Sequence, residues 1–512
     1  MQDNYKRNYI QIYIWKTLAI VVSFASFFVV VPFLTSNPQV YGIYTFCMSF
    51  QLYLSYADIG FLSAGQKYAA EAYARGDQKE EKSIFGFVGA VLLCMILPFS
   101  LLMITLSFRP EWALNGVAEE NKSLMSTLFF IMAIISPIQI FLQRVTQSIL
   151  TIRVKDYIAS RIDLGGSVLK ILSVFVFFSG GRYMLLPYFV FFNTVTITCS
   201  LLTIYFIRKS ENYDIWGLVK SVKFSKKYFD LMKKLSFASL GLTLSWVICY
   251  ELDLIYIGKI FTVDEVALYA VCLTLINFLR QFFNILFGPY SQRFNHFIAL
   301  NQNEEFSQLL SNIIKYTFPI CIFVCTVLCF SSKYIILLWV GVDYTASIPI
   351  LVILSWFYIF HFFSQPGGYV CISTENYKLI NLQSIITPII FIGSFFVFYI
   401  FGAGLLSFAY SKILMMVSNS ILAIIIVNKW TNTFQNIKSF LPLVLVLGIF
   451  SILAIWLFPF VFPNPEKSIT SLILLCTILI VMGIIYCGCM VFMDSNLKKL
   501  LVGVKNKILY NE

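Results

Sequence analysis

Charged residues are scarce in this 512-residue chain. They make up 12% of it, whereas 59% of the residues are hydrophobic and the mean hydropathy is +0.82. Soluble domains carry about twice that share of charge, so a soluble multidomain enzyme is excluded. The high apolar content excludes an intrinsically disordered chain as well. A polytopic membrane protein remains, provided that the apolar residues gather in runs of about 20.

Motifs for metal and nucleotide chemistry are also missing. The only histidines are His296 and His361, and the sequence contains no H-E-x-x-H pair and no G-x-x-x-x-G-K-[ST] phosphate loop. The longest loop predicted on the outer side has about 15 residues, which leaves no room for the donor and acceptor sites of a membrane polymerase. We therefore expect a transporter rather than an enzyme, with no metal and no cofactor.

Apolar runs of membrane-spanning length recur along the chain and predict an all-α protein with about 14 transmembrane helices. The even number places both termini on one side of the membrane. Of the 37 Lys and Arg residues, 26 lie on that side and six on the other, so the positive-inside rule places both termini in the cytoplasm. The predicted spans are 9–34, 40–63, 83–107, 123–149, 162–180, 184–207, 235–258, 265–290, 312–338, 346–371, 380–401, 404–427, 439–462 and 468–493.

A basic segment divides these spans into two sets of six and a final pair. We expect an N-terminal lobe over 1–207, a cytoplasmic linker over 208–234, a C-terminal lobe over 235–427, and two further helices with a basic tail over 428–512. Two-fold internal repeats of this kind are common in secondary transporters.

The linker alternates basic and aromatic residues, among them Trp216, Lys220 and Phe224. This pattern favours an amphipathic segment that binds anionic membrane lipid. A solvated loop that merely follows the positive-inside rule is the alternative.

Short motifs mark the start of each half. The first half has Tyr41-Gly42-Ile43-Tyr44, Asp58-Ile59-Gly60, Lys67-Tyr68-Ala69-Ala70-Glu71 and Gly76-Asp77, and the second has Asp253-Leu254-Ile255-Tyr256-Ile257-Gly258-Lys259 and Val266-Ala267-Leu268-Tyr269. Together they resemble the opening signatures of polysaccharide transporters, of the O-antigen flippase type, in the multidrug/oligosaccharidyl-lipid/polysaccharide exporter superfamily.

The resemblance implies a fold and an activity. The fold is two pseudo-symmetric six-helix lobes around a central cavity, and the mechanism is alternating access coupled to a proton or sodium gradient. The cargo is an undecaprenyl-diphosphate-linked O-antigen repeat unit for lipopolysaccharide, moved across the bacterial inner membrane to the periplasmic face. Other polysaccharide-assembly membrane proteins are expected partners. A multidrug exporter of the same superfamily is the first alternative, and a polymerase or ligase of the pathway is the second.

Cations inside the spans are the candidates for substrate binding. A charge at the centre of a span costs about 2.5–3.5 kcal/mol on insertion scales, so it needs a partner, a water-filled cavity or a route to the surface. Arg280 lies deepest, on one helix face with Asn277 and Asn284. A diphosphate suits this cationic face, whereas a structural ion pair or snorkelling is the alternative. The predicted substrate-binding residues are Arg280, Arg144, Lys16, Asn277, Asn284 and Gln143.

Ionisable groups in other spans are the candidates for ion coupling. Asp58 is in the second span, Glu251 and Asp253 are in the seventh, and His361 is in the tenth. Burial of a carboxylate favours its protonated form, which allows it to carry a proton at neutral pH. Glu251 and Asp253 are two residues apart, so we expect them to point to different faces of the span and not to line one cavity wall together. The structural alternatives are an ion pair or helix cap for Asp58 and a neutral, hydrogen-bonded imidazole for His361.

Overall fold

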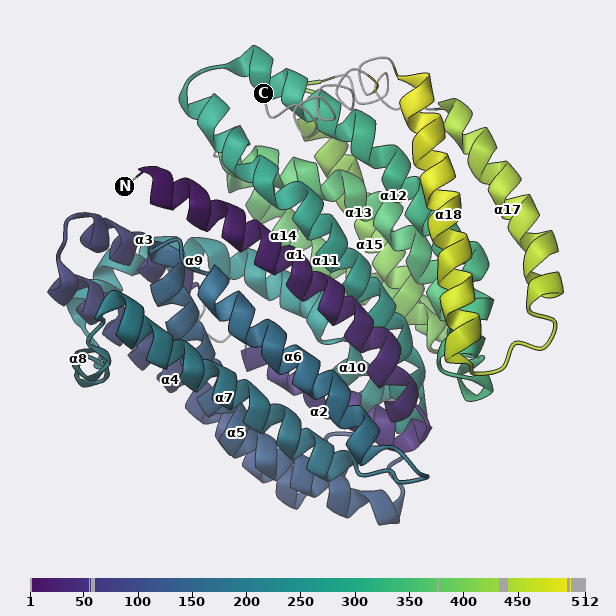
Figure 1. The fold of residues 1–512 in the computed structure, drawn as a ribbon, viewed down its shortest axis with the longest axis horizontal. Coiled ribbons are helices and arrows are strands. Elements are labelled where there is room, and N and C mark those ends of the chain that lie inside the picture. The colour runs from purple at the N-terminus through teal and green to yellow at the C-terminus, as the bar shows by residue number, and fades with distance from the viewer. Residues whose placement is uncertain are drawn as a thin grey trace. The chain divides into compact units, whose positions relative to one another are not determined.

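The structure is a computed structural model that describes residues 2–54, 56, 60–374, 377–431, 441–494 and 498. The regular elements in these residues are helices, with no strand among them (Figure 1). Ten of the helices are long and apolar enough to cross a membrane. Each of the 14 predicted spans coincides with one of the helices or with a broken pair of them. The prediction of an all-α, polytopic membrane protein is confirmed.

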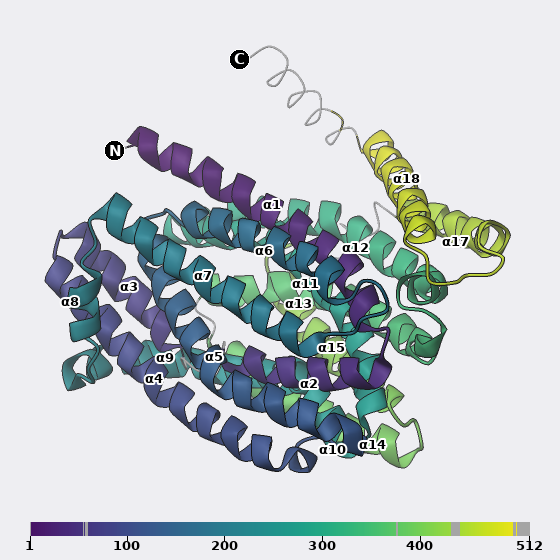
Figure 2. The same ribbon diagram turned by 60° about the horizontal axis from the view of Figure 1, so that its bottom comes forward.

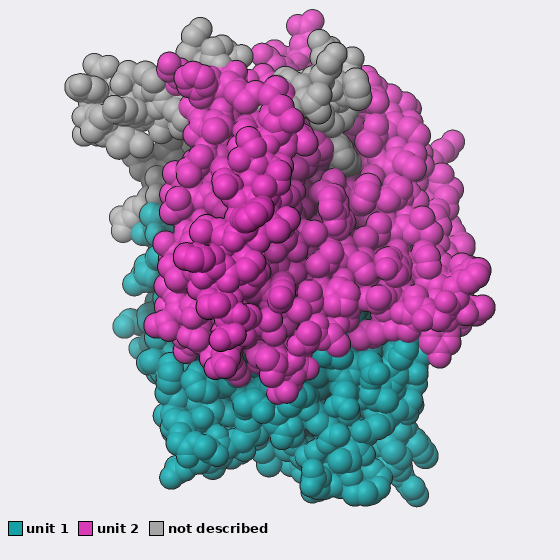
Figure 3. All heavy atoms as spheres, turned by 90° about the vertical axis from the view of Figure 1, so that its right-hand side faces the viewer, with its two compact units in different colours: residues 1–270 teal, residues 271–512 magenta. Residues whose placement is uncertain are grey.

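The chain forms two compact units, residues 1–270 and 271–512, coloured separately in Figure 3. The predicted lobe boundary was the 208–234 linker. The helices that follow this linker belong to unit 1 by their contacts, because they pack against α2 and α3. Unit 1 contains α1 (Gln2–Leu34), α2 (Pro38–Leu54), α3 (Phe61–Ala74), α4 (Gln78–Phe108), η1 (Pro110–Trp112), α5 (Glu119–Ile152), α6 (Tyr157–Phe177), α7 (Leu185–Glu211), α8 (Ile215–Lys220), α9 (Lys226–Trp246), η2 (Val247–Glu251) and α10 (Asp253–Ile260).

In unit 1 long helices pack side by side. Helix α1 lies along α6, and α5 packs against both α4 and α7 (Figures 1 and 2). At one end of these helices, a buried cluster includes Phe61, Phe87, Ile149 and Met232, which come from α3, α4, α5 and α9. Burial of these side chains fixes the ends of four helices to one another.

Two predicted spans are broken. The second, 40–63, divides into α2 and α3, and the seventh, 235–258, divides into α9, η2 and α10. The turn η2 is π-helical, with one more residue per turn than an α-helix, and Leu252 separates it from α10. The mean hydropathy of a segment is insensitive to such breaks. They matter because discontinuous helices often form the binding sites of transporters, and π-helical turns are frequent at functional sites.

Gly42, which belongs to the first-half motif, lies against Val263, just before the second-half motif Val266–Tyr269. A Cβ atom at Gly42 would be 2.3 Å from the carbonyl oxygen of Val263, so a side chain there would force the backbone apart. The loop after α4 is attached to the same turn, because the backbone of Asn115 accepts a hydrogen bond from Val263 and donates one to Gly258. The start of α2, this loop and the α10–α11 turn therefore form one tightly packed region of unit 1.

Unit 2 begins within α11 (Val263–Ala299) and is organised around two helix groups. Helix α13 packs against α12, α14 and α15, while the C-terminal pair α17 and α18 packs against α12. The hydroxyl of Tyr486 donates to the carbonyl of Pro319 (3.2 Å) and joins α18 to α12. The remaining elements are α12 (Asn303–Trp339), η3 (Val342–Tyr344), α13 (Ser347–Ser373), α14 (Tyr377–Ile400), α15 (Leu406–Val427), α17 (Leu441–Val461) and α18 (Ile469–Met493).

Candidate functional site

The break in the seventh span carries a buried carboxylate. Glu251 is the last residue of η2, and its Oε1 accepts hydrogen bonds from the Tyr56 hydroxyl and from the Trp246 indole nitrogen, both at 3.0 Å. Tyr56 lies in the break between α2 and α3, so the two interrupted spans meet at this carboxylate. The side chain is 6% exposed. Glu251 is thus a buried acid held by two donors at the junction of two broken helices.

Asp253 is still more deeply buried, at 1% exposure, and it is the first residue of α10. The expectation that Glu251 and Asp253 point to different faces assumed a regular α-helix between them. That assumption fails here, because a π-helical turn ends at Glu251 and α10 begins two residues later. Both predicted coupling carboxylates of the seventh span therefore lie in the interior of unit 1. Asp58, the third predicted carboxylate, lies outside the described residues.

Polar side chains on α5 face the broken second span. The Gln51 amide donates to the Gln139 carbonyl oxygen (3.4 Å), and the Gln66 amide donates to Ser148 (3.0 Å). Gln143 and Arg144 lie between these two contacts along α5 and are half-buried. The helix continues to Ile152, eight residues beyond Arg144, so Arg144 lies farther from the cytoplasmic end than the predicted span placed it. These residues form a polar interior face in unit 1.

In unit 2, Arg280 lies near the middle of α11, a helix of 37 residues. It is half-buried, as is Asn277 one turn earlier. Its positive charge acts on two side chains of α13, Tyr358 and His361. The Asn284 side chain lies outside the described part of α11. The sequence predicted that Arg280 binds substrate and that His361 couples an ion. In the structure the two side chains belong to unit 2 and interact electrostatically.

Aromatic rings hold the side chains around Arg280. The Tyr358 hydroxyl donates to the Ile276 carbonyl at 2.9 Å, and its ring stacks on Phe283 with centroids 5.7 Å apart. His361 is 6% exposed and stacks on Phe357 at 5.7 Å. Within the described residues, Nδ1 of His361 has no hydrogen-bond partner. A neutral imidazole with one open nitrogen can donate or accept a hydrogen bond beside the guanidinium.

The remaining cations differ in their surroundings. Lys16 on α1 is exposed, so both the binding role and the snorkelling alternative stay predictions. Lys412 on α15 is 4% exposed. Lys170 on α6 lies over the Phe192 ring at 4.0 Å. Among the described residues, no group of three His, Cys, Asp or Glu side chains could hold a metal ion.

Sequence reasoning missed a buried ion-pair cluster in unit 1, where the end of α5 meets the start of α4 and the end of α7. Arg153 contacts Glu81 at 2.8 Å and Glu211 at 3.9 Å, and their side chains are 4%, 0% and 10% exposed. The guanidinium also lies over the rings of Tyr73 and Tyr213, at 4.6 and 4.9 Å from their centroids. From the sequence alone Arg153 is one of many basic residues between two spans. The overlooked signal was Glu81, an acid at the very start of an apolar span.

No family model matches the chain, and no curated protein sequence does. Solved structures match it in fold. A multidrug resistance MATE family transporter of the MOP superfamily, in an inward-facing conformation, is 14% identical with a TM-score of 0.60, over 81% of this chain and 93% of its own.

The lipid II flippase MurJ, in an inward closed conformation, is 15% identical with a TM-score of 0.59, over 94% of this chain and 98% of its own. A MATE transporter from Vibrio cholerae is 13% identical with a TM-score of 0.52, over 83% of this chain and 97% of its own. The chain therefore has the fold that MATE transporters and the lipid II flippase MurJ share.

Proposed function

We propose that the protein is a flippase that moves an undecaprenyl-diphosphate-linked O-antigen repeat unit from the cytoplasmic to the periplasmic face of the bacterial inner membrane. The observation that carries this proposal is the fold match with a lipid II flippase over 94% of the chain. The part of the chain left uncovered is shorter than the segment 428–512, which contains the C-terminal helix pair. The match therefore extends into that segment. The proposed cargo is likewise a lipid, and the distribution of Lys and Arg supports an orientation with both termini in the cytoplasm.

The charges inside unit 2 support an anionic cargo. Arg280 on α11 and Lys412 on α15 are half-buried and buried cations, and a guanidinium can hold two phosphate oxygens through charge-assisted hydrogen bonds. A diphosphate beside the lipid is the part of the cargo that these cations suit. Arg280 with Asn277 is the proposed centre of recognition, and Arg144 and Gln143 on α5 are secondary candidates.

A multidrug exporter is the second candidate. It is favoured by the TM-score of 0.60 with a MATE transporter and by the two buried carboxylates in unit 1, which would suit a cationic drug. In the flippase, Glu251 and Asp253 have a different role and couple transport to a proton or sodium gradient.

Expression in two bacterial strains tests the function. In an O-antigen flippase-null strain, we expect the protein to restore surface polysaccharide and to clear lipid-linked repeat units from the cytoplasmic face. In a strain lacking its drug exporters, we expect no change in resistance to cationic drugs. Restored resistance without restored polysaccharide would overturn the proposal in favour of the multidrug exporter.

Glu251→Gln is expected to abolish the gradient dependence of transport. The variant keeps an oxygen that can accept from Tyr56 and Trp246, but it cannot take up a proton or carry a charge. In proteoliposomes, the variant's transport rate with an imposed proton or sodium gradient should be no higher than its rate without one. Asp253→Asn is tested in the same way. Glu119→Gln, at an exposed acid in the first turn of α5, is the matched control. Wild-type gradient dependence in both interior variants would move the coupling role to Asp58 or His361.

A further inference from the structure

Helix α8 and the residues after it present an aromatic and basic surface at the edge of unit 1. Trp216, Val219 and Lys220 lie at i, i+3 and i+4, on one face of the helix, and Lys223 and Phe224 follow. Trp216 is 70% exposed, Phe224 66% and Val219 55%, and the lysines are exposed as well. The opposite face buries Leu218 against α4. The α8 patch consists of Trp216, Val219, Lys220, Lys223, Phe224 and Lys227.

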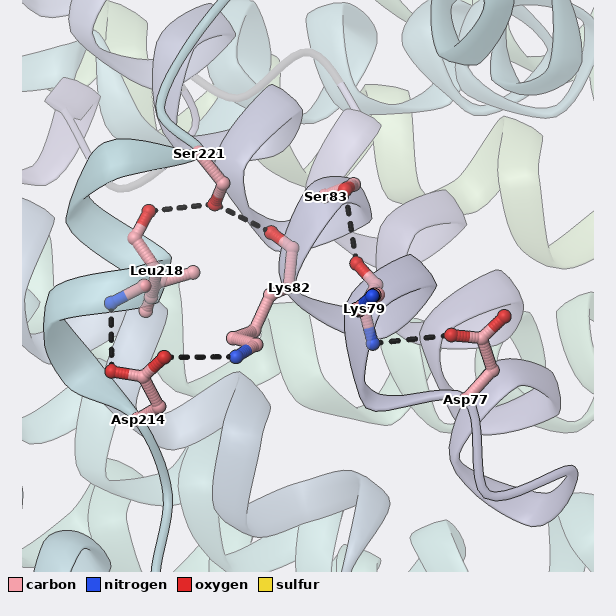
Figure 4. Close-up of polar contacts among 8 residues, drawn as sticks. Asp77, Lys79, Lys82, Ser83, Asp214, Leu218 and Ser221 are labelled. Carbon is pink, nitrogen blue, oxygen red and sulfur yellow. Dashed lines mark hydrogen bonds and ion pairs between the residues drawn. The ribbon is translucent and has the colours of Figure 1, made fainter.

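The structure holds α8 firmly on the start of α4 (Figure 4). Asp214 accepts a hydrogen bond from the Gly217 amide (2.8 Å) and pairs with Lys82 (3.0 Å), while the Ser221 hydroxyl donates to the Lys82 carbonyl (2.8 Å). The Gly217 amide and Lys82 lower the pKa of the Asp214 carboxyl, which keeps this cap ionised at neutral pH. The patch is therefore preorganised rather than part of a loose loop.

The contacts of two glycines of α4 show how far along this helix the patch extends. A Cβ atom at Gly86 would be 2.2 Å from the Ser221 carbonyl, and one at Gly89 would be 3.8 Å from Val222. From Lys82, at the basic end of this span, to Gly89 is about 10 Å along the helix. Ser221 and Val222, which join Lys220 to Lys223 in the patch, therefore pack beside the first three turns of α4.

We propose that the α8 patch binds the headgroups of anionic lipids in the cytoplasmic leaflet. Trp216, Val219 and Phe224 would enter the boundary between headgroups and acyl chains, where aromatic side chains are favoured. Lys220, Lys223 and Lys227 then contact lipid phosphates, an attraction that each lysine strengthens. This binding holds the cytoplasmic end of α4 against the membrane surface, and it does not depend on the proposed cargo.

Charge argues against a second copy of the chain as the occupant. Residues 215–229 contain no acidic side chain, and four of them are lysines. A two-fold symmetric contact through this patch would bring the same lysines opposite one another. An anionic lipid surface supplies the opposite charge instead.

Hydrogen–deuterium exchange of the full-length protein in lipid nanodiscs tests the proposal. We expect the amides of 215–229 to exchange on the order of tenfold more slowly in discs that contain 30% phosphatidylglycerol than in discs of phosphatidylcholine alone. Soluble glycerol phosphate added to phosphatidylcholine discs should not reproduce this protection. The triple variant Lys220→Gln, Lys223→Gln, Lys227→Gln should lose the difference. The matched control in unit 2 is Lys378→Gln, Lys429→Gln, Lys498→Gln, which alters exposed lysines far along the chain.

A second measurement covers the apolar half of the patch. The fluorescence difference between the wild type and Trp216→Phe isolates Trp216 from the other seven tryptophans. Lipids brominated near the headgroup boundary should quench this difference strongly. Equal protection in both lipid compositions, protection that survives in the lysine variant, protection by glycerol phosphate, or an unquenched Trp216 would each overturn the proposal. Protection that appears only in discs holding two copies would assign the patch to self-association instead.

Discussion

Arg280→Ala is expected to reduce transport of the lipid-linked saccharide by roughly two orders of magnitude while the protein still inserts in the membrane. Removing one partner of a buried, hydrogen-bonded charge pair usually costs 2–5 kcal/mol, which corresponds to at least a thirtyfold loss. Arg280 lies near the middle of α11, and with Asn277 it is the proposed centre of diphosphate recognition. Surface polysaccharide in a flippase-null strain should disappear, and repeat units should accumulate on the cytoplasmic face.

Three controls separate a binding role from a structural one. Arg280→Lys keeps the charge but loses the two-pronged geometry of the guanidinium, so it should retain part of the transport. Arg161→Ala removes an exposed arginine that lies over the Trp15 ring at 5.0 Å, and it should transport normally. If Arg280 serves only to stabilise the fold, abundance should fall in the alanine and lysine variants while transport per molecule stays unchanged. Full activity at normal abundance in Arg280→Ala would contradict both roles.

His361 is a second predicted site residue close to Arg280. The Arg280 charge acts on its imidazole, and its Nδ1 atom has no partner within the described residues. The sequence placed His361 among the coupling groups because it is a titratable residue in a span. Its stacking on Phe357 and its open Nδ1 atom suit the hydrogen-bonding alternative, and the coupling role stays a prediction.

Hydropathy predicted the helices well because each span must bury its backbone hydrogen bonds within one continuous apolar segment. It did not predict where the helices break. The sequence between Trp246 and Asp253 is as apolar as its neighbours, and only the structure shows the π-helical turn that ends at Glu251. The break in the second span falls at 55–60, where Asp58 and Gly60 are residue types that favour turns within an otherwise apolar run.

Contacts between distant residues were the second limit. Tyr56 and Glu251 are 195 residues apart, and a single sequence contains no signal that pairs them. The Glu81–Arg153 pair is separated by 72 residues, and each partner has an ordinary local explanation, as a first-turn acid of α4 and as a cytoplasmic loop cation. The polar character of individual residues could be predicted, whereas the partner that gives each its role required the fold.

The Glu81–Arg153 pair has a large energetic consequence because neither side chain reaches water. Two charges that leave water are stable only when they pair closely and their remaining hydrogen-bonding groups are satisfied. Arg153 meets this condition with Glu81, Glu211 and the Ile149 carbonyl, to which it donates at 3.0 Å. Tyr73 and Tyr213 add cation–π contacts. The cluster joins the ends of α3, α5 and α7 to the start of α4.

Arg153→Ala is therefore expected to destabilise unit 1 by about 3–5 kcal/mol, because it leaves the Glu81 carboxylate buried without its partner. In detergent this should lower the melting temperature by roughly 5–15 °C. Arg75→Ala is the matched control, since Arg75 pairs with Glu80 at the same 2.8 Å distance but the two side chains are 59% and 28% exposed. An exposed pair of this kind contributes about 0–1 kcal/mol, so the control should melt close to the wild type.

The double variant Glu81→Leu, Arg153→Met distinguishes a buried charge effect from a general packing effect. Replacing both charges with apolar side chains of similar volume removes the unpaired carboxylate, so we expect it to melt well above Arg153→Ala and near the wild type. If the double variant melts as low as the single one, then the loss comes from the cation–π and packing contacts of Arg153. If Arg153→Ala melts like Arg75→Ala, the pair does not stabilise the cytoplasmic ends of these helices.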